Sequence, residues 1–154
     1  MKKKSFIVGL AIGGGFGAYT FIKHSKERKH ADETFFNSIK DVCDLLKLDY
    51  NTMSENEKRY YYNKVASNLY RASQIKTKTS YKKLENDDIN SPSALYKLHI
   101  FMSSSNESVN NERRMEVLSE RGEELIKALE NLNKNSKDKE NWIELSKQVN
   151  KIVD

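Results

Sequence analysis

The sequence predicts an all-α protein: an N-terminal single transmembrane helix, followed by a helical bundle of about five helices ending in an antiparallel helical hairpin. The chain of 154 residues has Gly 6 and Pro 1, and five of those glycines fall between residues 9 and 17. Because β architectures need glycine and proline at their turns, this usage argues against them. Apolar residues also recur every three or four positions through most of the remaining chain, as helices require. The length suffices for one ordinary domain, which excludes a large multidomain enzyme.

Charge divides the chain into four segments. Residues 1–4 form a basic tail, residues 5–22 contain no charged side chain, residues 23–31 form a basic juxtamembrane linker, and residues 32–154 form the helical domain. As a helix, residues 5–22 are about 27 Å long, close to the roughly 30 Å hydrocarbon core of a bilayer. We therefore expect an uncleaved transmembrane helix. The alternative is a signal peptide that is cleaved from a secreted helical protein.

Three glycines of the uncharged segment recur at every fourth residue: Gly9, Gly13 and Gly17. On a helix they form one shallow groove, which lets a second membrane helix approach closely and favours self-association. The alternative is the general abundance of glycine in membrane helices. The expected partners are therefore the membrane and a protein, either another protein or a second copy of this chain.

Residues 2–18 read KKKSFIVGLAIGGGFGA and resemble the opening of YtxH-like small membrane proteins of Gram-positive bacteria. The resemblance covers about a ninth of the chain and implies a single N-terminal span followed by a helical tail. It implies no activity and no functional residues. The tail of this chain is richer in aromatic residues than the Lys/Ala/Glu-rich helix expected of that family.

The orientation of the span is weakly specified, because three lysines precede the uncharged segment and four Lys/Arg residues follow it. Moving three lysines outward against a potential of 100 mV costs about 7 kcal/mol without a translocation motor. We therefore expect the N-terminus inside. The protein is then a single-pass protein of the cell membrane whose C-terminal domain is extracytoplasmic.

The first two helices of the helical domain are predicted from their starts and apolar stripes. Asp32 caps the first helix, and the spacing of Ser54 and Glu57 is that of a capping box at the start of the second. The second helix ends between residues 76 and 80. The first stripe is Phe35, Ile39, Val42, Cys43 and Leu46. The second stripe is Tyr61, Val65, Leu69 and Ala72, with Tyr62, Ala66 and Ile75 at its margins.

Three further helices complete the domain. The third starts at Ser91 and Pro92, a cap followed by proline at the first helical position. Its buried residues are Ala94, Leu95, Leu98, Phe101 and Met102. The last two helices carry heptad seams and are joined by a short connector, residues 133–136, so they form an antiparallel hairpin. The seam residues are Met115, Leu118, Gly122, Leu125, Leu129, Leu132, Trp142, Leu145, Val149 and Ile152. The missing side chain of Gly122 lets the facing helix approach or accommodates Trp142.

Residues 58–83 hold eight Lys/Arg residues, several tyrosines and no acid. This mixture suits an anionic lipid or cell-wall polymer, because cations pair with phosphates while tyrosine rings lie at headgroup level. The candidate residues are Lys58, Arg59, Tyr60, Arg71, Lys82 and Lys83. The alternative is internal pairing with an acidic row on the fourth helix: Glu112, Glu116, Glu120 and Glu124. Nucleic acid is disfavoured as a partner, because residues 31–154 carry 20 Lys/Arg against 21 Asp/Glu.

The sequence contains no catalytic, cofactor-binding or metal-binding constellation. His24, His30 and His99 are isolated, without a Cys/His cluster or a zinc-binding histidine pair. Cys43 lies on an apolar stripe, where a buried thiol is a poor nucleophile. We therefore predict a membrane-anchored, non-catalytic helical protein-interaction module of the adaptor, immunity or exclusion type. The alternative function is a surface protein that binds anionic lipid or cell-wall polymer through residues 58–83.

Overall fold

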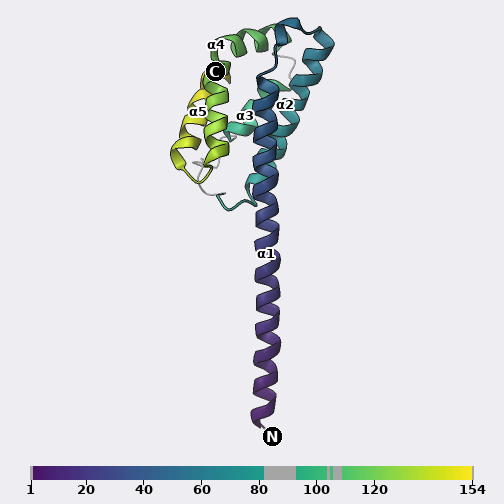
Figure 1. Ribbon diagram of the computed structural model, residues 1–154, viewed down its shortest axis with the longest axis vertical. Coiled ribbons are helices and arrows are strands. Elements are labelled where there is room, and N and C mark those ends of the chain that lie inside the picture. Colours follow the sequence, from purple (N-terminus) through teal and green to yellow (C-terminus); the bar gives the residue numbers. More distant parts are fainter. Residues whose placement is uncertain (1, 82–92, 104, 106–108, 154) are drawn as a thin grey trace.

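The computed structural model describes residues 2–81, 93–103, 105 and 109–153, with side chains from Ile22 onward. Its elements are α1 (Lys2–Leu46), the 3-10 helix η1 (Tyr50–Thr52), α2 (Glu55–Lys76), α3 (Ala94–Met102), α4 (Asn111–Lys134) and α5 (Lys139–Val153). These described ranges contain no strand, which confirms the all-α class. The second half of α1 packs with the other helices into a bundle, and its first half extends away from that bundle (Figure 1).

Helix α1 is continuous through the boundary that the sequence predicted. Asp32, the expected cap, lies inside the helix, so the predicted helix start at this residue is wrong. Residues 23–32 contain neither glycine nor proline, and a pair such as Lys29 and Glu33, 3.9 Å apart, supports the helix across one turn. The Asp32 carboxylate instead accepts a hydrogen bond of 2.9 Å from the backbone N–H of Ser80, which ties α1 to the chain that follows α2.

Within the part of the chain whose side chains are described, no helix has both the length and the apolar character that a membrane span requires. Residues 5–21 of the predicted transmembrane segment lie outside that part, and Gly9, Gly13 and Gly17 lie outside it with them. Of this segment, the structure describes the helical backbone within α1. The predicted packing of the three glycines therefore stays a prediction.

One apolar face of each helix builds the core. All five residues of the first predicted stripe are buried: Phe35, Ile39, Val42, Cys43 and Leu46. On α2 the buried aromatic residue is Tyr62, whereas Tyr61 is only partly buried. The reason is η1, where Tyr50 stacks on the Tyr62 ring at 4.8 Å between centroids. Burial raises the pKa of the Cys43 thiol to about 11, so the thiol is protonated at neutral pH, as befits a core residue.

The ends of α2 and α3 test the predicted start and stop signals. The capping box of α2 is present, since Ser54 Oγ accepts from the Glu57 N–H and Glu57 Oε2 accepts from the Ser54 N–H. Helix α2 ends at Lys76, within the predicted range. Helix α3 starts later than predicted, because its cap is Ser93, whose hydroxyl accepts from the Tyr96 N–H at 3.4 Å. Both serines carry a capping hydroxyl, so the sequence could not distinguish them. The residues predicted to be buried on α3 are buried: Ala94, Leu95, Leu98, Phe101 and Met102.

Helices α4 and α5 lie side by side and run in opposite directions, as predicted (Figure 1). The turn between them is closed by Trp142 Nε1, which donates to the Ser136 carbonyl at 2.9 Å. Met115 and Leu118 are partly buried, because Arg114 and Val117 occupy the buried positions one residue earlier. The other seam residues are buried: Gly122, Leu125, Leu129, Leu132, Trp142, Leu145, Val149 and Ile152.

The structure overturns the interpretation of Gly122. A Cβ at this position has Leu118 Cβ as its nearest neighbour, 4.0 Å away and on the same helix. Among the described residues, no facing helix brings an atom within 4 Å of this Cβ position, and Trp142 does not fill the space. Trp142 instead packs at the other end of α4, where its ring centroid lies 5.8 Å from that of Phe35 and 6.4 Å from that of Tyr81.

Candidate functional site

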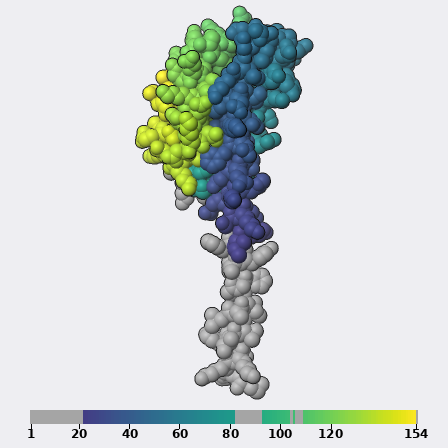
Figure 2. Space-filling view, viewed as in Figure 1, coloured from purple at the N-terminus to yellow at the C-terminus, as the bar shows by residue number. Residues whose placement is uncertain are grey.

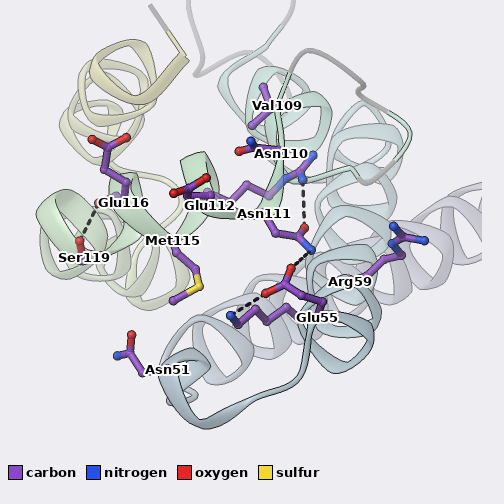
Figure 3. A pocket seen from close by; sticks show the side chains of 12 residues that line it. Asn51, Glu55, Arg59, Val109, Asn110, Asn111, Glu112, Met115, Glu116 and Ser119 are labelled. Carbon is purple, nitrogen blue, oxygen red and sulfur yellow. Dashed lines mark hydrogen bonds and ion pairs between the residues drawn. The ribbon is translucent and has the colours of Figure 1, made fainter.

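A groove of about 820 Å³ lies between the start of α2 and the start of α4. It is at the end of the bundle farthest from the N-terminus of α1, and we call it the distal groove (Figures 1 and 3). One wall consists of Asn51, Glu55, Lys58 and Arg59. The other wall comes from the chain between Val109 and Ser119, with the partly buried Met115 among the lining residues.

Two capped helix starts meet at the distal groove. The Asn110 side chain caps α4 by accepting from the Arg113 N–H at 2.8 Å, as the capping box does for α2. A direct hydrogen bond joins the two starts, since Asn111 Nδ2 donates to Glu55 Oε2 at 2.9 Å (Figure 3). Because both helix starts bring partial positive charge to this end, acidic residues such as Glu55 and Glu112 are favourably placed in their first turns.

Arg114 fixes one side of the distal groove. It is only 2% exposed, its Nε donates to the Phe101 carbonyl at 3.0 Å, and its Nη2 donates to the Ser103 carbonyl. These carbonyls are at the C-terminal end of α3, where a helix leaves acceptors without intrahelical partners. A third bond runs from Nη1 to Asn111 Oδ1 at 3.3 Å. Arg114 therefore clamps the end of α3 to the start of α4.

Burial also governs the ionisation of the groups around this clamp. Desolvation lowers the pKa of Arg114 and raises the pKa of Tyr62, whose ring lies 5.8 Å from the guanidinium, to about 12. At neutral pH the guanidinium is charged and the phenol is neutral. Sequence reasoning missed Arg114 because it assigned the neighbouring Met115 to the seam. The one available signal was Val117, an apolar residue one turn after Arg114 and outside the assigned seam.

The rim of the distal groove carries both signs of charge. Lys58 Nζ lies 2.8 Å from Glu55 Oε1, and this hydrogen bond, with that from Asn111, lowers the pKa of Glu55. Neither Arg59 nor Glu112 forms an ion pair with another residue in the described part of the chain, and Figure 3 shows both without an interaction. The groove thus offers a cation and a carboxylate beside an apolar Met115, which suits a folded protein surface.

The predicted basic-aromatic residues separate into two places. Lys58 and Arg59 line the distal groove, Tyr60 is 55% exposed beside them, and Arg71 is exposed three turns farther along α2. Lys82 and Lys83 lie outside the described residues. The structure adds Lys64, Tyr70 and Lys78 as exposed residues of α2 and its C-terminal turn, with Lys64 Nζ 4.5 Å from the centre of the Tyr60 ring.

The alternative hypothesis expected cations of α2 to pair with the acidic row of α4, and among the described residues they form no ion pair with it. In the described chain, Lys58 of α2 pairs with Glu55 on its own helix, and Glu116 of α4 pairs with Arg113 at 2.8 Å on its own helix. The ion pair that reaches α4 from another helix region comes from Lys47, just after α1, to Glu130 at 2.6 Å. The exposed cations of α2 therefore face solvent.

Of the three histidines, His99 has structural surroundings. His99 Nδ1 donates to the Ala66 carbonyl at 2.9 Å, and its ring centroid lies 5.2 Å from that of Tyr70 and 5.6 Å from that of Tyr96. His24 lies 3.4 Å from Glu27 on α1. Among the described residues, no three His, Cys, Asp or Glu side chains form a group that could hold a metal ion.

Comparison with known proteins adds no family. No family model matches the chain, and no curated protein or solved structure matches it either. The function is therefore inferred from the residues and geometry of this chain.

Proposed function

We propose that this protein is a membrane-anchored, non-catalytic helical interaction module, of the adaptor, immunity or exclusion type, that presents the distal groove to a protein partner. The observation that carries the proposal is the continuity of α1. Residues 5–22 are uncharged, and the helix that contains them continues into the core through Phe35 and Ile39. A bilayer-embedded segment is thereby joined to the bundle without a flexible linker.

This continuity sets the distance of the distal groove from the bilayer. Leu46, where α1 ends, is about 36 Å along the helix from Ile22, the last residue of the uncharged segment. The distal groove lies at this end of the bundle (Figure 1). The proposed partner therefore binds well beyond the lipid headgroups, as expected for a module that reaches a soluble or peripheral protein.

The chemistry of the distal groove supports a protein partner. Arg59 and Glu112 offer opposite charges, and Met115 adds an adaptable apolar contact. Interfaces between proteins combine such an apolar centre with a polar rim. The Asn111–Glu55 hydrogen bond joins the two walls, and the Arg114 clamp fixes the α4 wall to the end of α3, so the groove is ordered before the partner arrives and the ordering cost of binding falls.

Site-specific photocrosslinking in native membranes tests this function. A photoreactive residue at Ser119, inside the distal groove, is expected to give one discrete protein adduct, whereas the same residue at exposed Gln74 of α2 gives none. Glu112→Lys should reduce the adduct, and the matched change Glu123→Lys, on the same helix outside the groove, should not. Equal labelling from both positions contradicts the groove, and release of the protein by alkaline carbonate contradicts the anchor.

A second candidate function is supported by the exposed face of α2. Lys64 and Arg71 share this face with Tyr60 and Tyr70, and residues 58–83 contain no acid. Because α2 packs alongside α1 (Figure 1), the face stands upright on a bilayer that contains the N-terminal segment, so an anionic polymer fits it better than the lipid surface. We expect the protein to bind a polyanionic polymer with an affinity that falls steeply with salt. This binding should be lost in the double variant Lys64→Gln with Arg71→Gln.

A further inference from the structure

A second hollow lies where α1 leaves the bundle. It has a volume of about 510 Å³, and we call it the junction pocket. Ile75 at the end of α2 and Lys78 in the turn after it line one side, and α1 contributes His24, Glu27, Arg28, His30 and Ala31. Figure 2 shows the described part of α1 emerging at this base of the bundle. The pocket therefore lies between the uncharged segment and the body of the protein.

The position of the junction pocket along α1 places it at the level of lipid headgroups. If the hydrocarbon core ends at Ile22, then His24 lies about 3 Å and Arg28 about 9 Å beyond it along the helix. The headgroup layer of a bilayer is roughly 5 to 7 Å thick on each side. Arg28 and His24 thus bracket the depth at which lipid phosphates lie.

Lys78 lines the same pocket as Arg28, and hydrogen bonds fix the turn after α2 that carries it. Thr79 Oγ1 donates to the Lys76 carbonyl at 2.6 Å, and Asp32 accepts from the Ser80 N–H. Asp32 lies one turn after Arg28 on α1, so this contact brings the chain around Lys78 against that stretch of helix. These hydrogen bonds thereby place two cations from separate elements, Arg28 and Lys78, at one pocket.

We propose that the junction pocket binds the headgroup of an anionic phospholipid with a hydroxylated headgroup, of the phosphatidylglycerol type. This inference rests on the proposed membrane anchor. Arg28 and Lys78 pair with the phosphate. The Glu27 carboxylate accepts a hydrogen bond from a headgroup hydroxyl and repels a headgroup carboxylate, which disfavours phosphatidylserine.

Lipid selectivity of the full-length protein tests the proposal. The protein is reconstituted into phosphatidylcholine vesicles, and the association of spin-labelled phosphatidylglycerol, phosphatidylserine and phosphatidylcholine is compared by electron paramagnetic resonance. We expect a preference for phosphatidylglycerol that falls roughly five-fold for each pocket cation lost in Arg28→Gln with Lys78→Gln. The matched control, Lys26→Gln with Lys29→Gln, removes the same charge from α1 outside the pocket and should keep most of the preference.

Each other outcome has a distinct meaning. Equal losses in the pocket and control variants, or no preference in a correctly inserted protein, overturn the junction pocket as a lipid site while leaving the anchor intact. Abolition of the preference by millimolar inorganic phosphate identifies a free-phosphate site and overturns the lipid assignment. Failure of the protein to insert into vesicles instead contradicts the anchor on which the proposal rests.

Discussion

The two ends of the bundle each bury one cation, and they do so in different ways. At the distal end, Arg114 makes three hydrogen bonds, two of them to carbonyls at the end of α3. At the end where α1 emerges, Lys76 is 4% exposed and its Nζ lies 5.0 Å from the centre of the Trp142 ring. Among the described residues these are the two buried cations. The distal end thus sets a buried guanidinium on carbonyls at a helix end, whereas the other end sets a buried lysine against an aromatic cluster.

The two ends should therefore respond differently to mutation. An arginine fork satisfies several acceptors at once, so its removal leaves buried carbonyls without donors. An aromatic ring fills volume, so its removal leaves a cavity. If both ends respond alike to changes of side-chain volume and of hydrogen bonding, the proposed difference between them is wrong.

The largest effect is expected from Trp142→Ala. The side chain is 1% exposed and packs on Phe35 and Tyr81, so the cavity should lower the free energy of unfolding by about 3 to 5 kcal/mol. Circular dichroism during urea unfolding measures this change in the full-length protein. Ile143→Ala is the control, because Ile143 is 45% exposed and should cost well under about 1 kcal/mol. Similar losses in the two variants contradict the proposed cluster.

Arg114→Met should have the next largest effect. It keeps the apolar volume but leaves the Phe101 and Ser103 carbonyls without their donor, so we expect a loss of about 2 to 4 kcal/mol. Arg114→Lys should recover only a minor part of this loss, because an ammonium lacks the planar fork.

The control for Arg114 is its neighbour Arg113, whose ion pair with Glu116 is exposed. Arg113→Met is expected to change stability by less than about 1 kcal/mol. Urea unfolding of the three variants side by side, followed by the fluorescence of Trp142, decides between the two roles. Full rescue by lysine means that charge alone matters, and the clamp is then wrong.

Much of the fold could be predicted from local signals, because periodicity and capping act within a few residues. The stripe from Phe35 to Leu46 and the Ser54 capping box are of this kind. The predicted start of the first helix was wrong because nothing in residues 23–32 interrupts the helix; what no local pattern encodes is that the Asp32 carboxylate accepts from the backbone N–H of Ser80, 48 positions away. Arg114 was missed for the same reason, since its acceptors depend on how α3 ends.

Neither pocket could be predicted from the sequence. The distal groove joins residues from the starts of α2 and α4, and the junction pocket joins α1 with the end of α2. The residues of segment 58–83 were correctly recognised as basic and aromatic, yet they are divided between the groove and an exposed face. Tertiary packing alone decides which of them share a site.

The smallest effect is expected midway between the two ends, at Gly122→Ala. The nearest atom to an added Cβ is 4.0 Å away, so the methyl group fits without a clash. Because glycine is a poor helix former, alanine should raise the free energy of unfolding by about 0.5 to 1 kcal/mol. Thermal unfolding by circular dichroism measures the gain. A loss of stability points to a close helix contact at this position, as the sequence alone suggested.

The continuity of α1 is the claim on which the proposed function depends, and a distance between two points of this helix tests it. Spin labels at positions 26 and 40, both exposed, flank Asp32 and can be introduced in a Cys43→Ala background. A continuous helix separates their backbones by about 21 Å, and double electron–electron resonance on membrane-reconstituted protein should give one narrow distribution consistent with that spacing. A broad distribution, or a clearly shorter distance, reveals a hinge near Asp32 and contradicts the rigid connection between the N-terminal segment and the bundle.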